Sequence, residues 1–99
     1  MHEIKEIVED MWEELEGAEH YAIKYAKLKD KDGNRANVYA GMAKAELEHL
    51  DNLHQMAMRC IERHRMEGHP DTAALEMIWE WEHNKIQEKK GKIKYMLAA

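Results

Sequence analysis

The stretch from Asn34 to His64 constrains the fold most, because its apolar residues recur at helical spacing along its whole length. At about 100° per residue, they share one sector of a helix: Tyr39, Met42, Ala43, Leu50, Leu53, Ala57 and Cys60. Glu46 and His49 fall in the same sector. A carboxylate or imidazole that faces a core must be paired, hydrogen-bonded or bound to a metal, because an isolated buried charge is costly. The stretch predicts a long amphipathic helix with a polar site in its apolar face.

A second apolar repeat of 3.6 residues predicts a helix over about residues 3–28: its members are Ile4, Ile7, Val8, Met11, Leu15, Ala18, Tyr21, Ala22 and Tyr25. Glu14 lies inside this stripe. The short segment Asp30–Asn34 has the composition of a turn, and Asn34 is the expected N-cap of the next helix, over about residues 34–66. These two helices should form an antiparallel hairpin, because their connection is so short.

The third helix is expected over about residues 72–97, after a break that contains Gly68 and Pro70. Its apolar stripe is patchy and consists of Ala74, Leu75, Ile78, Trp81, Ile93 and Met96, with Glu82, Lys85 and Lys89 also on it. No partner is evident for Glu82. Trp79 and Trp81 fall on different sides of this helix, so at least one should be exposed, which suggests that the helix contacts another chain.

Composition fits a single all-α domain of 99 residues, with one Pro and no Phe. The net charge of -5 argues against nucleic-acid binding. No apolar run is long enough to cross a membrane, and the first ten residues lack the apolar segment of a secretory signal. Cys60 is the only cysteine, so no internal disulfide can form and a cytoplasmic setting is expected.

Three polar residues inside the stripes should meet at one height of the hairpin. Reflecting the chain about residue 32 or 33 places Glu14 opposite roughly residue 51, near the level of Glu46 and His49. The spacing of Glu46 and His49 puts their side chains one turn apart on one face of a helix. We therefore expect Glu14, Glu46 and His49 to form a metal site.

Other histidines are assigned no metal. Glu80 and His83 repeat the Glu-x-x-His spacing, but they lie off the apolar stripe and are interpreted as surface residues. His64 lies on the stripe of the second helix without a paired acid and is expected in the core or an interface. His54 flanks that stripe, beside the expected site.

The three candidate ligands are half of the ligand set found in one class of two-metal protein. Four-helix di-metal carboxylate proteins take one Glu from each of two helices and Glu-x-x-His from each of the other two. A two-helix hairpin also cannot bury its apolar face alone. Pairing two chains about a two-fold axis supplies both the missing ligands and the missing cover. The sequence thus predicts a homodimer, or a higher homo-oligomer, with a shared two-metal centre.

These residues resemble the ferritin-like superfamily. Glu14 is followed seven residues later by Tyr21, and Glu46-x-x-His49 stands on the next helix. The local sequence around Glu13–Tyr21 is similar to the short encapsulated ferritins, whose hairpin dimerises. The resemblance covers about residues 8–60. It departs from that family at His20, where an aromatic residue is usual.

The resemblance implies a di-iron centre that oxidises Fe(II) with O₂ or peroxide, with Glu14 or Glu46 as the bridging ligand and His49 as a terminal ligand. Tyr21 would be a hydrogen-bond partner beside the metals. Manganese or zinc would suit the same ligands. The C-terminal sequence KYMLAA does not resemble the peptide that targets cargo into encapsulin shells, so such a shell is not an expected partner.

Two other interpretations stay open. In one, the chain is a non-enzymatic helical interaction module, and the polar residues only fix how chains pair. In the other, a structural Zn or Mn ion joins the dimer without redox chemistry. The first predicts that the purified protein holds no metal, and the second predicts bound metal without oxidation of Fe(II).

Overall fold

The computed structural model describes residues 2–99, and three α-helices account for nearly all of them. They are α1 (His2–Leu28), α2 (Gly33–Met66) and α3 (Thr72–Ala98). Each helix begins and ends within one residue of its predicted range. The prediction of an all-α chain is therefore confirmed. Among the helices of the described residues, none is both long and apolar enough to cross a membrane.

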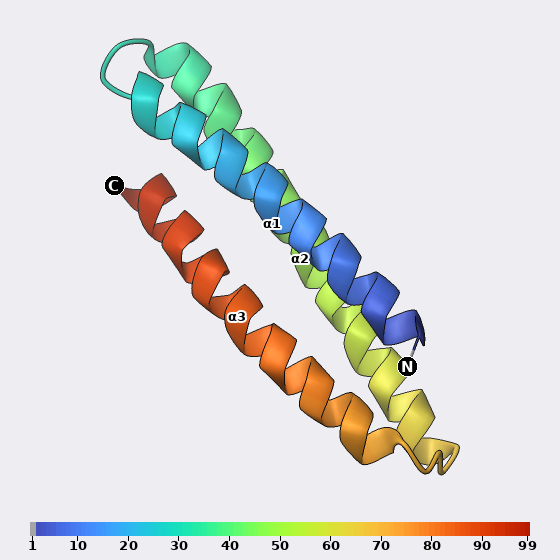
Figure 1. Ribbon diagram of the computed structural model, residues 1–99. Helices are drawn as coiled ribbons and strands as arrows, with labels where there is room; N and C mark the ends of the chain where they lie inside the picture. Colours follow the sequence, from blue (N-terminus) through green and yellow to red (C-terminus); the bar gives the residue numbers. More distant parts are fainter. Residues whose placement is uncertain (1) are drawn as a thin grey trace.

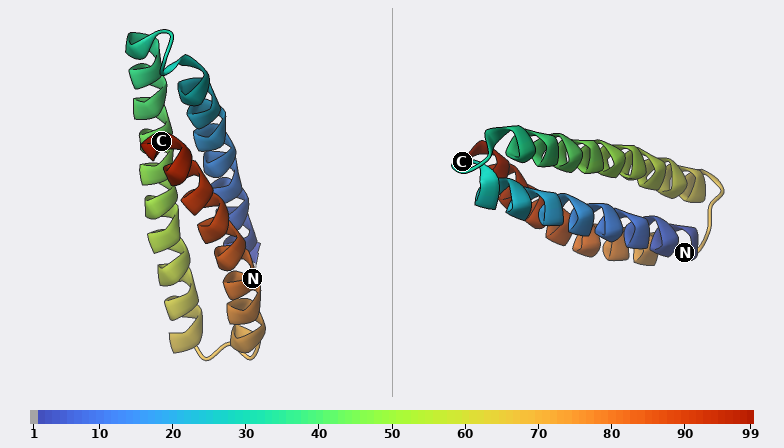
Figure 2. Two further views of the ribbon diagram at one scale, coloured as in Figure 1. Left: turned by 90° about the vertical axis from the view of Figure 1, so that its left-hand side faces the viewer. Right: turned by 90° about the horizontal axis from the view of Figure 1, so that it is seen from above.

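The helices lie side by side in an elongated molecule, 56 Å long and 17 Å across. Figure 1 shows α1 and α2 as an antiparallel hairpin, with α3 running back along it. Figure 2 shows that α3 crosses the hairpin obliquely, from the side of α1 towards α2. The core is one cluster along the three helices, and its largest fully buried side chains are Ile4, Met11, Leu15, Leu50, Leu75, Ile86 and Ile93.

The N-cap of α2 differs from the predicted one. Asp32, two residues before Asn34, accepts a hydrogen bond at Oδ1 from the backbone N–H of Arg35, at 3.2 Å. Asp32 and Asn34 are both suitable capping residues, and composition alone cannot separate them. The helix begins at Gly33, so Asn34 lies inside its first turn.

The buried face of α3 matches the predicted one only in part, at Leu75 and Ile93. Trp79 is 6 % exposed, whereas Trp81, which the predicted stripe contained, is 68 % exposed. The buried side chains of α3 are Leu75, Trp79, Ile86 and Ile93. The last three are seven residues apart, the repeat of a helix that winds around its neighbours. The predicted stripe included Trp81 and left out Trp79 and Ile86, so it was rotated away from the buried face.

Two charged residues continue this seam of α3, and both have partners on α1. Glu82 accepts a hydrogen bond from Nε1 of Trp12 at 3.0 Å. One heptad later, Lys89 pairs with Glu19 at 3.1 Å. Trp12 and Glu19 are themselves seven residues apart, so two polar contacts set the register of α3 against α1. The sequence did not reveal the partner of Glu82 because Trp12 is distant in the chain.

Candidate metal centre

The structure brings Glu14, Glu46 and His49 together across the seam between α1 and α2. One potential ligand atom from each side chain lies within 4.8 Å of the other two. Nδ1 of His49 is 3.3 Å from Oε2 of Glu14. The connection between α1 and α2 is short, so it brings Glu46 and His49 of α2 to the height of Glu14 on α1. Two carboxylates and one imidazole thus meet at one point of the hairpin.

The sequence predicted that Glu46 and His49 face the core. In the structure, none of the three side chains does so. In residues 2–99 no polar or charged residue is fully buried. The side chain of Glu14 is 26 % exposed and that of His49 is 56 % exposed. Most of the predicted apolar sector of α2 is buried within one chain, including Leu50 and Cys60. Its open edge carries His49, which is exposed, while Glu46 is partly buried and Glu14 lies on α1.

The open edge lies on the side of α2 away from α3. The contacts of α3 with α2 involve Asp51, which pairs with Lys90 at 2.8 Å, and His54, whose ring packs on Trp79. At about 100° per residue, both fall on the side of α2 opposite to His49. The third helix therefore leaves the site uncovered.

Exposed apolar side chains flank the site along the same side of α2. Val38, Met42 and Met56 are all exposed. On a helical projection at about 100° per residue, they fall within about 40° of one another, and His49 falls among them. An apolar stripe interrupted by potential metal ligands is therefore available to another surface.

The two carboxylates of the site disfavour each other's charge. Hydrogen bonding to Glu14, burial and the negative charge of Glu14 together raise the pKa of Glu46 above its ordinary value of 4.5, while the charge of His49 acts in the opposite direction. A like charge at close range favours the protonated form of a carboxyl. A cation between the two carboxylates would remove this conflict. The donor set therefore fits a metal ion on electrostatic grounds as well as by geometry.

Gly17 gives Glu46 its place against α1. A Cβ atom added at Gly17 would lie 2.9 Å from Oε2 of Glu46, closer than real Cβ atoms come to another atom. Any larger residue at this position would push the carboxylate away from the helix. A glycine inside a helix lowers helix stability, so its presence at the site has a steric explanation.

Tyr21 lies one helical turn beyond Gly17 and stacks on Tyr39 of α2, with ring centroids 6.1 Å apart. Within residues 2–99, no hydrogen bond joins Tyr21 to the three candidate ligands. The structure thus places Tyr21 in packing between the two helices. Its role beside a metal stays a prediction.

The mouth of the site is a shallow acidic hollow. Asp10, Glu13 and Glu14 line it from α1, and His49, Asn52 and Leu53 line it from α2. The rim of the hollow therefore carries further carboxylates beside the candidate ligands. Such a concentration of negative charge attracts cations.

The remaining histidines lie elsewhere, and two predictions about them need correction. His83 is half-buried rather than on the surface, because its ring stacks on Trp79 at 5.0 Å and lies 4.9 Å from that of His54. Burial and the neighbouring charges of His54 and Lys90 lower the pKa of His83. His54 belongs to this contact between α2 and α3, away from the site.

The second correction concerns His64, which does have a paired acid. Its Nε2 lies 2.7 Å from Oδ1 of Asp71, and the potential ligand atoms of His64, His69 and Asp71 all lie within 4.8 Å of one another. Sequence reasoning missed this group because its members come from a helix end, a turn and the start of the next helix. The signal was the glycine turn between them, with Gly68 at φ +71°.

The chain matches no protein-family model, no curated protein and no solved structure. Its function is therefore inferred from the site itself.

Proposed function

We propose that the chain binds Fe(II) at Glu14, Glu46 and His49 and oxidises it at a centre shared by two chains. The observation that carries the proposal is the meeting of two carboxylates and an imidazole on the uncovered side of the hairpin. Mixed oxygen and nitrogen donors suit iron, manganese and zinc, and of these only iron and manganese can change oxidation state. The acidic rim supplies a local attraction for the incoming cation.

A second chain would complete the centre. One chain offers three protein ligands, and two chains related by a two-fold axis offer four Glu and two His, the set found in di-metal carboxylate bundles. The exposed stripe of Val38, Met42 and Met56 supports this arrangement, because pairing two hairpins through it would bury apolar side chains on both sides of the site. In such a dimer α3 would lie on the outside of the four-helix bundle.

Iron is the substrate of the proposed reaction. Two Fe(II) ions give one electron each to O₂, which takes up two protons and becomes hydrogen peroxide, while the two ions become Fe(III). The carboxylates of Glu14 and Glu46 hold the ions close together and offset the added positive charge. His49, more than half exposed, would offer a ring nitrogen to the ion at the mouth of the site. An uncovered mouth allows iron to enter and leave.

Oxygen uptake during Fe(II) oxidation tests this function. Wild type should consume one O₂ for two iron ions oxidised, and Glu14→Ala and His49→Ala should lose the reaction while staying helical. Glu48→Ala is the matched control, because Glu48 is an exposed carboxylate next to His49 that does not belong to the site. Retained activity in either site variant would overturn the assignment.

Two outcomes would favour the other interpretations. Metal bound by wild type and lost in Glu14→Ala, but without oxygen uptake, would indicate a structural ion. Purified protein that binds no metal, and whose pairing is unaffected by chelators, would indicate an interaction module in which Glu46 and His49 only fix the register of the chains.

A further inference from the structure

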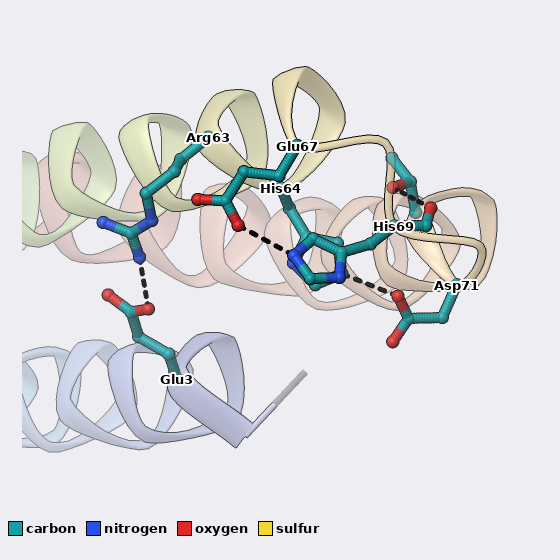
Figure 3. Close-up of polar contacts among 7 residues, drawn as sticks. Glu3, Arg63, His64, Glu67, His69 and Asp71 are labelled. Carbon is teal, nitrogen blue, oxygen red and sulfur yellow. Dashed lines mark hydrogen bonds and ion pairs between the residues drawn. The ribbon is translucent and has the colours of Figure 1, made fainter.

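A second group of metal-ligating side chains lies at the turn between α2 and α3, at one end of the molecule (Figure 3). His64 comes from the last turn of α2, His69 from the connecting turn and Asp71 from the residue before α3. Their potential ligand atoms lie within 4.8 Å of one another. This group is independent of the proposed iron site, which lies on the α1–α2 seam.

Asp71 does not cap α3, so its carboxylate can serve as a metal ligand. Asp71 occupies the N-cap position of α3, where an aspartate usually accepts a hydrogen bond from a backbone N–H of the first turn. Here its side chain makes no capping hydrogen bond. It turns instead to His64, with Oδ1 2.7 Å from Nε2. The side chain of Asp71 therefore contacts the imidazole of His64 and does not cap α3.

His69 has a carboxylate partner, as metal-binding histidines usually do. Its Nε2 lies 2.8 Å from Oε2 of Glu67, and its ring stacks on that of His64, with centroids 4.1 Å apart. Histidine ligands commonly donate the ring N–H that faces away from the metal to a carboxylate. When Nε2 carries the proton shared with Glu67, the other ring nitrogen keeps its lone pair for an ion.

The backbone of the turn is fixed independently of these side chains. Gly68 adopts φ +71°, which only glycine tolerates easily. The carbonyl of His69 accepts hydrogen bonds from the hydroxyl of Thr72 at 2.7 Å and from its backbone N–H at 3.3 Å. The two arginines next to His64 in the sequence are both paired with carboxylates: Arg63 with Glu3 (Figure 3), and Arg65 with Glu62 and Glu76.

We propose that His64, His69 and Asp71 form a second metal site, for an ion of the Zn²⁺ class, that ties the end of α2 to the start of α3. Two imidazoles and a carboxylate with a fourth position open to water is a common zinc environment. Zinc–ligand distances of about 2.0–2.2 Å require the donors to close to roughly 3.4 Å from one another. Exposed His69 reaches this by a side-chain rotation while the backbone stays in place.

Zinc titration of the full-length Glu46→Gln protein tests the proposal, since that background removes a ligand of the iron site. Calorimetry should give one Zn²⁺ per chain, and Co²⁺ in its place should give a visible absorption of low-coordinate cobalt. His69→Gln and Asp71→Asn should each weaken binding at least about tenfold. Glu67→Gln should weaken it by about tenfold to a hundredfold, because Glu67 orients His69. His20→Gln, an exposed histidine outside the group, should bind as the parent does.

Thermal unfolding adds a second readout. Zn²⁺ should raise the Tm of the Glu46→Gln protein, because the ion binds only the folded turn, and this rise should vanish in His69→Gln. His69 and Asp71 are on the surface and their variants should fold, so they decide the question even where His64→Gln is unstable. Zinc binding that is unchanged in both variants, or absent from the Glu46→Gln protein, would overturn the second site whatever the outcome of the iron experiments.

Discussion

At the scale of single residues, the candidate iron site places two carboxylates so close together that, without a cation between them, their negative charges repel. The carboxylates of Glu14 and Glu46 meet beside His49, and the pKa of Glu46 is raised by hydrogen bonding to Glu14, by burial and by the charge of Glu14. Gly17 makes room for the Glu46 carboxylate. Each of these features can be changed by one substitution.

The first prediction concerns the pH dependence of the metal-free protein. The unfolded chain releases the Glu46 proton near its ordinary pKa of 4.5, while the raised pKa keeps that proton on the folded chain. The folded state then binds more protons, so its stability falls as the pH rises through the folded-state pKa. Glu46→Gln should show a smaller fall above pH 4.5, measured as urea midpoints with chelator present. Glu48→Gln should behave like wild type, and an equal effect of both substitutions would contradict the account.

Gly17→Ala should separate stability from activity. Alanine favours the helix over glycine by up to about 1 kcal/mol, so the free energy of unfolding should stay level or rise. The new Cβ displaces the Glu46 carboxylate, and the rate of iron oxidation should fall by about tenfold to a hundredfold. Gly91→Ala is the control, because a Cβ there meets no atom within 4 Å. Gly91→Ala should have a higher free energy of unfolding than wild type and the same rate of iron oxidation. Equal rates in the two variants would show that Glu46 needs no such space.

At the scale of helices, the sequence predicted the elements and misplaced some of their faces. The periodicity and the two glycine-containing breaks were sufficient for the bounds of α1, α2 and α3. The reflection at the turn also brought Glu14 level with Glu46 and His49, because a short turn leaves little choice of register. The face of α3 was predicted only in part, since the stripe contained the exposed Trp81 in place of the buried Trp79, and the partners of its charged residues lie far away in the chain.

The solvent exposure of the candidate metal site also could not be predicted from the sequence. A helical projection shows that Glu46 lies among apolar residues, but it cannot show which edge of that sector α3 covers. The group of His64, His69 and Asp71 was missed for a related reason, because the shape of a turn, and not a helical period, brings these residues together.

The two tryptophans of α3 test its packing. Trp79→Ala should lower the free energy of unfolding by about 3–5 kcal/mol, as expected for a buried aromatic side chain. Trp81→Ala should change it by less than about 0.5 kcal/mol, because its ring is mostly exposed. Urea unfolding of both variants measures the difference. A large effect of Trp81→Ala in place of Trp79→Ala would mean that the predicted stripe was right and the described packing wrong.

At the scale of the whole molecule, the chain is a narrow three-helix rod with an uncovered apolar edge along α2. The third helix covers one side of the α1–α2 hairpin, and the other side presents the candidate ligands between Met42 and Met56. A second hairpin on that side would give a four-helix bundle with its polar residues at the centre. Metal chemistry and packing thus favour the same dimer.

Charged substitutions distinguish which face pairs. Met42→Glu and Met56→Glu should convert a dimer to monomers in sedimentation measurements and reduce iron oxidation, while helicity is retained. Met77→Glu, at a methionine on α3 that is more exposed than either, should leave the dimer intact. A dimer lost only in Met77→Glu would indicate that chains pair through α3, and the shared centre would then be wrong.

The most direct test of the shared centre is an anaerobic titration with Fe(II), followed by exposure to air, on wild type and Glu46→Ala. A shared centre should saturate at one iron per chain, two per dimer, and give a ferric absorbance in the near ultraviolet that appears with oxygen in wild type and is absent from the variant. No iron binding by wild type, or equal uptake and absorbance in both proteins, would contradict it.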